Sequence, residues 1–376
     1  MRKPYISSLK GIACLFVALG HFLGTIKYAS VIPVNTDFFL WLERCRIGFI
    51  LDESFWLYLF FIVSGYLVAN SKVTTISHFF VRAIIRFLRL AIPIFVACSI
   101  IFVFNRFMPY YNAQTSVFFE NAWLQNAYST DFSVGNLLLS PIDVLFLKRT
   151  IFNSPYWVLR SMMCASFLIY ILTYIKLKDK SQKIFWILSV LLSLSLLFFD
   201  RIIFVCIMGA FICYYEAPLQ KLFKFKMILI GSGLVSIALC FLHGTVGAIA
   251  VFSWMIIAIP KLLRVKDFLE KKVFSFVGKV SFGIYSFHWP IFCSCGALII
   301  IKLWNILGGG YAIFISIILS AIATILISIF FYYIVEKPAN KLIKMLKDKS
   351  EILIQKQQGD LAGSELVTAD FDSKSK

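Results

Sequence analysis

Apolar segments of about 20 residues recur along this chain, and they leave few folds open to it. A helix needs about 20 residues to cross a bilayer, because the hydrocarbon core is about 30 Å thick and each residue rises about 1.5 Å. We place such segments at about 6–26, 53–70, 86–108, 155–175, 183–199, 200–217, 225–243, 245–263, 276–301 and 311–335. Only the Asp200-Arg201 break separates the fifth from the sixth. The pattern predicts an all-α, polytopic membrane protein with about ten transmembrane helices.

The basic charge of the chain is explained by topology. The formal net charge is +18, while 60% of the residues are hydrophobic. Lys and Arg gather in alternate loops, among them 72–89, 176–183, 221–226 and 261–279. This is the positive-inside pattern, which predicts that both termini are cytoplasmic. We therefore expect no nucleic-acid partner.

The polar segments suggest how the chain is divided. Residues 1–345 form one predicted transmembrane domain, and 346–376 are polar enough to predict a disordered cytoplasmic tail. The loop at 109–154 is long for a connector, which favours a lid or a re-entrant element over the outer face. The nine cysteines show no zinc-ligand spacing, so no metal site is expected.

Two ionisable residues in the first segment are the strongest functional signal. Lys10 and His21 are eleven residues apart, which places them on one helix face about 16 Å apart along the axis. An ionisable side chain at membrane depth is costly and usually functional. A cation at the boundary and a base near mid-depth suit a long anionic cosubstrate with a reactive tip. The alternative is a lysine that snorkels to the interface and a histidine bonded to a neighbouring helix.

A basic stripe stands at the start of the third segment. Arg82, Arg86 and Arg89 follow an i, i+4, i+7 spacing, so they share one helical face. Arginine binds phosphate through two parallel hydrogen bonds, and the stripe therefore suggests a phosphate clamp. The alternative is topological charge in contact with lipid headgroups.

Polar residues also mark the later segments. Trp157 and Arg160 lie near the outer end of the fourth segment, where they would suit a sugar ring or, for the tryptophan, an interfacial aromatic belt. Ser281, Tyr285 and His288 form a stripe within the ninth segment, in a structural or a functional role. Glu336, at the end of the last segment, lies among basic residues, and we expect it to form a salt bridge at the cytoplasmic boundary.

Five motifs in order resemble the membrane-bound acyltransferase family 3. SLKGIACLFVALGHF resembles the family's opening motif of a basic residue, ten residues and a histidine, and FFIVSGYLVA its second-helix motif. RAIIRFLRLAIP resembles its R-x-x-R motif, and SFGIYSFHWP and VEKP its late motifs. This chain departs from the family pattern at one position. Many members carry a glutamate five residues after the tryptophan that corresponds to Trp157, and this chain has Met162 there. The chain stops some forty residues after Glu336, so the resemblance implies a member without an appended SGNH esterase-like domain.

The resemblance implies transfer of an acyl group, usually acetyl, from cytoplasmic acyl-CoA to a carbohydrate hydroxyl. The acceptor would be a surface or lipid-linked polysaccharide, and the location a bacterial cytoplasmic (inner) membrane. Lys10, Arg86 and Arg89 would hold the CoA phosphates, and Trp157 and Arg160 the sugar. His21 would act as general base or carry the acyl group covalently. The rival class is a transporter or flippase for a lipid-linked glycan, which acyl-CoA dependence distinguishes.

Overall fold

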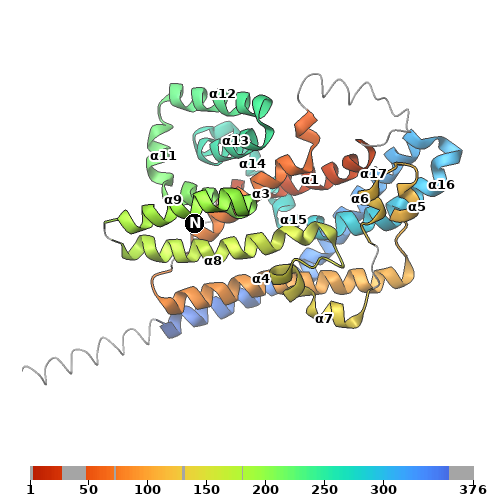
Figure 1. Ribbon diagram of the computed structural model, residues 1–376, viewed down its shortest axis with the longest axis horizontal. Helices are drawn as coiled ribbons and strands as arrows, with labels where there is room; N and C mark the ends of the chain where they lie inside the picture. Colours follow the sequence, from red (N-terminus) through yellow and green to blue (C-terminus); the bar gives the residue numbers. More distant parts are fainter. Residues whose placement is uncertain (1–2, 28–47, 72, 129–131, 180, 355–376) are drawn as a thin grey trace, which may run out of the picture.

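The fold consists of helices joined by short connections (Figure 1). The computed structural model describes residues 3–27, 48–71, 73–128, 132–179 and 181–354, and no strand occurs within them. The longer helices are α1 (Pro4–Lys27), α3 (Glu53–Ala69), α4 (Ile76–Phe107), α8 (Trp157–Lys178), α9 (Lys183–Phe199), α10 (Arg201–Tyr214), α12 (Lys226–Leu242), α13 (Gly244–Ala258), α15 (Lys272–Ile291), α16 (Ala297–Leu307) and α17 (Gly309–Phe331). The shorter ones are α5 (Asn112–Ser116), α6 (Ala122–Gln125), α7 (Val134–Ile142), α11 (Glu216–Leu222) and α14 (Leu263–Leu269).

Six helices in the described part of the chain are long and apolar enough to span a bilayer. A seventh candidate is the α10–α11 pair, which is bent by 73°. Each of the ten predicted segments falls on a helix, but α3, α9 and α12 have only 17 residues each. Seventeen residues rise about 26 Å, which is short of the hydrocarbon core. The all-α class is therefore confirmed, while ten spans and cytoplasmic termini stay predictions.

The helices α1 and α15 lie side by side, and glycines allow their backbones to touch. A Cβ atom on Gly11 would collide with the backbone of Gly278, and one on Gly278 would collide with Ser7. His21 is ten residues after Gly11, and His288 is ten residues after Gly278. The two helices thus keep one register from the glycine contact to the histidines, which brings the histidines to the same level.

The segment between α4 and α8 folds against one end of the bundle, as predicted for a lid. The backbone N–H of Tyr111 donates to the carbonyl of Cys293 at 2.9 Å, and the Thr115 hydroxyl donates to the carbonyl of Ala297 at 3.3 Å. We call residues 109–128 the lid. It covers the π-helical turn Phe292–Gly296, which follows α15 directly.

The start of α1 and the end of the last helix lie at the opposite end from the lid (Figure 1). After α17 the helix continues through a π-helical turn, Tyr332–Glu336, as far as Ile354. Glu351 on this extension accepts a hydrogen bond from Arg82 at 2.7 Å. Residues 346–354 of the predicted tail are helical, and the Arg82–Glu351 contact joins them to the start of α4. The rest of that tail, 355–376, lies outside the described residues.

Candidate active site

His21 on α1 and His288 on α15 form a buried pair. The distance from His288 Nε2 to His21 Nδ1 is 3.3 Å, and the ring centroids are 5.1 Å apart. His21 is 8% exposed and His288 is 0% exposed. The sequence identified each as a functional candidate, and the structure brings them together in one site.

The backbone contacts of the pair assign the tautomers. His21 Nδ1 lies 2.9 Å from the carbonyl oxygen of Val17, and His288 Nδ1 lies 3.0 Å from that of Ile284. A carbonyl only accepts, so each Nδ1 carries the proton and each Nε2 keeps a lone pair. His288 Nε2 then accepts from His21 Nδ1. The remaining basic nitrogen of the pair is His21 Nε2, for which the described residues offer no hydrogen-bond partner.

Two tryptophans cover the pair at the lid end. The ring of Trp289 on α15 lies 5.8 Å from the His21 ring, and that of Trp123 on α6 lies 5.9 Å from it at an interplanar angle of 20°. The two indoles are themselves 4.4 Å apart. Trp289 is fully buried and its Nε1 has no hydrogen-bond partner among the described residues, whereas Trp123 is 45% exposed.

Lys10 and Glu336 lie toward the other end of α1. The Lys10 ammonium sits 5.6 Å from the centroid of the Phe60 ring and acts electrostatically on the buried Glu336 carboxylate. Glu336 forms no ion pair with a described residue, and its Oε1 lacks a hydrogen-bond partner there. The expected boundary salt bridge is therefore not formed. Glu336 ends the π-helical turn after α17 and is buried within the bundle, away from the surface lysines.

The three arginines of the predicted stripe have different surroundings. Arg86 donates from Nε to the Ser166 hydroxyl at 3.0 Å and from a terminal nitrogen to the Ser64 hydroxyl at 3.2 Å. Arg82 pairs with Glu351, and Arg89 is exposed. The stripe lies inside α4, which begins ten residues before the predicted start of 86, and its members differ in burial: Arg82 is buried, whereas Arg89 is exposed.

Lys10 and Arg86 approach the same helix. Lys10 lies over Phe60 and Arg86 binds Ser64, and these two positions are one turn apart on α3. The arrangement therefore has two cations toward one end, a histidine pair about three turns further along α1, and an aromatic cover beyond it. That order is the one expected of a site for a long anionic molecule with a reactive tip.

The family match agrees with this arrangement. A family model described as an acyltransferase domain matches residues 3–333 of the 376-residue chain. The chain belongs to the acyltransferase 3 family. No curated protein and no solved structure matches it. Family membership confirms the resemblance drawn from the motifs and makes this protein a membrane acyltransferase.

Ser281 and Tyr285, which share α15 with His288, make different contacts. The Ser281 hydroxyl donates to the carbonyl of Gly278, in its own helix, at 3.0 Å. The Tyr285 hydroxyl donates to the carbonyl of Pro155, immediately before α8, and its ring is 6.3 Å from that of His288. Both side chains are buried. The Tyr285 contact ties α15, and with it His288, to the residue pair that precedes α8.

Trp157 and Arg160, the predicted sugar-binding residues, lie on an exposed face of α8. Arg160 Nε donates to the carbonyl of Phe146 at 3.0 Å, and the Lys148 ammonium lies 6.0 Å from the centroid of the Trp157 ring. Trp157 is 42% exposed. No contact of either side chain with His21 or His288 is found among the described residues. The hydrogen bond of Arg160 ties the chain before α8 to that helix.

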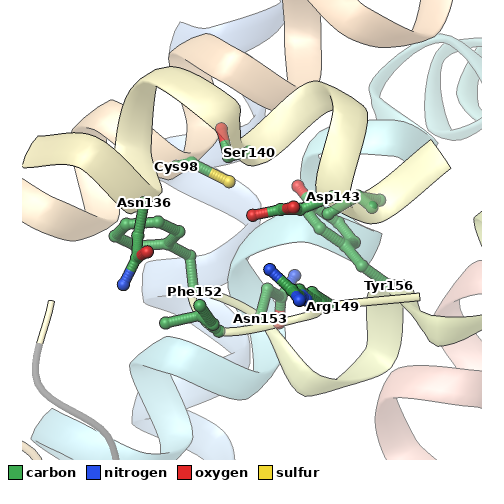
Figure 2. Close-up of a pocket in the computed structure, with 10 residues that line it drawn as sticks. Cys98, Asn136, Ser140, Asp143, Arg149, Phe152, Asn153 and Tyr156 are labelled. Atoms are coloured by element: carbon green, nitrogen blue, oxygen red, sulfur yellow. The ribbon is translucent and has the colours of Figure 1, made fainter. Parts of the chain in front are cut away.

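A small cleft lies beside these residues, between α4, α7 and the segment that precedes α8 (Figure 2). Figure 2 shows Asp143 and Arg149 directed toward one another across it. Ser140, Asn153 and Tyr156 also line it, and each has a buried oxygen without a hydrogen-bond partner among the described residues. Tyr156 lies against Tyr285, with ring centroids 5.8 Å apart. Tyr285 therefore separates this cleft from the histidine pair.

Trp123 is the site residue that the sequence did not reveal. It lies in a loop without helical periodicity, outside the family motifs quoted above. Its place over His21 depends on the lid folding back to α15, a contact between residues far apart in sequence. The available signal was a tryptophan within a long polar loop, which gives no indication of its partner.

Proposed function

We propose that this protein transfers an acetyl group from cytoplasmic acyl-CoA to a hydroxyl of a surface or lipid-linked carbohydrate. The single observation that carries the proposal is the His21–His288 pair, in which one basic nitrogen, His21 Nε2, remains unused. The bacterial cytoplasmic membrane is the expected location, with the lid on the outer face.

The donor end is proposed at Lys10 and Arg86. A guanidinium carries five N–H donors, so Arg86 retains three for phosphate oxygens after binding Ser64 and Ser166. Lys10 adds an ammonium about 16 Å from His21 along α1, a separation that the extended pantetheine arm of CoA can bridge. Arg89, which is exposed, contributes through charge at the entrance.

The reaction follows from the tautomer of His21. Its Nε2 takes the proton of the sugar hydroxyl while that oxygen attacks the thioester carbonyl. The carbon–sulfur bond then breaks, the ester carbonyl re-forms, and the CoA thiolate takes the proton back from the imidazolium. In the covalent version, His21 Nε2 attacks the thioester carbonyl, the carbon–sulfur bond breaks and CoA leaves as the thiolate. The sugar hydroxyl then attacks the acyl-imidazole, the carbon–nitrogen bond breaks, and the hydroxyl proton passes to the CoA thiolate. The Val17 carbonyl and His288 Nε2 together accept from Nδ1–H and so hold His21 in the required tautomer in both cases.

Radiolabelled acetyl-CoA tests the proposal. The purified protein in lipid nanodiscs would receive [¹⁴C]acetyl-CoA and the source organism's surface polysaccharide, stripped of esters by mild alkali. We expect alkali-labile label in the polysaccharide and release of one CoA per acetyl group. Movement of glycan across vesicles without label incorporation would instead support a flippase. A label trapped on the protein after acid quenching, absent from His21→Ala, would identify the covalent version.

A further inference from the structure

The exposed indole of Trp123 lies directly beside the proposed chemistry. It is 45% exposed, while its ring packs at 4.4 Å on Trp289 and at 5.9 Å on His21. A tryptophan in a membrane interface belt faces lipid headgroups, whereas this one is stacked over a buried histidine. The indole therefore offers one aromatic surface to the exterior while it covers the residue that the acceptor must reach.

The lid holds this indole in a fixed place. Asn112 Nδ2 donates to the carbonyls of Leu124 and Gln125 at 2.9 and 3.1 Å, and Asn121 Oδ1 accepts from the N–H of Leu124 at 3.0 Å. Asn121 Nδ2 also donates to the carbonyl of Thr25 at 3.4 Å, which ties the lid to α1. A pre-ordered surface binds with a smaller loss of conformational entropy than a mobile one.

The turn before α6 shows a further sign of function. Glu120 has a φ of 48°, a left-handed conformation that costs free energy for a residue with a side chain. Such outliers concentrate at functional sites. The strained turn places Trp123 between exposed polar residues, namely Glu120 before it and Gln125 and Asn126 after it.

We propose that Trp123 is the stacking platform for the acceptor sugar ring, with Glu120, Gln125 and Asn126 positioned around it for the ring hydroxyls. One face of a pyranose carries mostly C–H groups and suits the negative face of an indole. A sugar stacked there has its hydroxyls at the edge of the lid, next to His21. The buried N–H of Trp289, unpartnered among the described residues, is a donor for an oxygen that enters between the lid and the histidine pair. This inference rests on the proposed function.

Acceptor kinetics test the platform, and Trp157 supplies a matched control. Trp157 is 42% exposed, close to the 45% of Trp123, but it lies on α8 away from the histidines. Initial rates of acetyl transfer would be measured in nanodiscs against increasing de-esterified polysaccharide, and acetyl-CoA affinity by calorimetry. Trp123→Ala should raise the acceptor KM about tenfold and leave the acetyl-CoA Kd within about twofold. Trp123→Phe should raise the acceptor KM by about threefold or less, because an aromatic face survives, and Trp157→Ala should leave it unchanged.

Two further variants keep the test decisive if Trp123→Ala does not fold. Gln125→Ala and Asn126→Ala remove exposed side chains from the edge of the platform, and each should raise the acceptor KM by about two- to threefold. An active wild type whose acceptor KM is unchanged in Trp123→Phe, Gln125→Ala and Asn126→Ala overturns this inference alone. So does a Trp123→Ala variant that weakens acetyl-CoA binding as much as it weakens the acceptor. A wild-type protein that transfers no acetyl group overturns the proposed function and this inference with it.

Discussion

Two tryptophans of nearly equal exposure, Trp123 and Trp157, lie in very different surroundings. Trp157 stands at the start of α8, five residues before the position at which many family members carry a glutamate, yet its ring contacts Lys148 and no site residue among those described. Trp123 lies in a loop that no motif marks, yet it stacks on His21. The difference shows that a motif can identify a helix that builds a site without identifying the side chains that enter it.

The largest expected effect concerns the histidine on which the comparison depends. His21→Ala should lower acetyl transfer by about 10²- to 10⁴-fold, because it removes the basic nitrogen. Acetyl-CoA binding and the elution volume of the purified protein should stay close to those of wild type. Radiolabel transfer and calorimetry on the same sample provide both readouts. Transfer near the wild-type level would remove His21 from the chemistry and, with it, the significance of its neighbour Trp123.

A smaller effect is expected for the partner of His21. His288→Ala should reduce kcat by about 10- to 100-fold and leave the acetyl-CoA Kd unchanged, because one of the two acceptors of the His21 Nδ1–H is lost and the Val17 carbonyl alone remains. His288→Gln should recover part of the rate, since an amide oxygen also accepts a hydrogen bond. Equal losses in both variants, accompanied by a lower melting temperature, would indicate a purely structural histidine.

Two arginines of α4 show a similar contrast, because Arg86 binds side chains of neighbouring helices whereas Arg89 is exposed. Arg86→Ala should weaken acetyl-CoA binding about tenfold at low ionic strength, with a smaller difference from wild type as salt rises. Arg89→Ala, at an exposed position of the same helix, is the matched control and should change affinity by about twofold or less. Calorimetry at two salt concentrations measures both. Equal effects of the two substitutions would indicate a diffuse field rather than a clamp.

The smallest effect is expected at Arg160. Arg160→Ala removes the hydrogen bond to the Phe146 carbonyl, so the free energy of unfolding should fall by about 1 kcal/mol while acetyl transfer per folded molecule stays the same. Thermal unfolding followed by fluorescence, together with the transfer assay, separates the two quantities. A selective loss of glycan acylation with unchanged stability would instead indicate that Arg160, at the start of α8, belongs to the acceptor site.

The sequence was sufficient to locate the helices. Apolar segments located every long helix, and the eleven-residue interval placed Lys10 and His21 on one face of α1. The sequence could not predict which helices pair with one another, because hydrophobic periodicity describes one helix at a time. Nothing in the local pattern of α1 indicates that His21 meets His288, whose common level follows from the close packing of the two helices at Gly11 and Gly278.

The predictions for the arginine stripe and for Glu336 differ from the structure for a related reason. Arg82, Arg86 and Arg89 share a face by spacing, but the partners on α3, α8 and the last helix decide which one enters the bundle. The basic residues around Glu336 predicted a salt bridge at the cytoplasmic boundary, whereas Glu336 ends a π-helical turn and is buried. These are properties of contacts between elements, and composition and spacing do not encode them directly.

The 267 positions that separate His21 from His288 have a consequence for the synthesis of this protein. A ribosome has completed 271 residues before it begins α15 at Lys272. Until that helix is inserted, α1 waits in the bilayer with Gly11 uncovered and with half of the histidine pair. A chain that stalls or is cleaved before this point therefore contains Lys10, His21 and Arg86 but lacks His288. The histidine pair is thus completed only late in biogenesis.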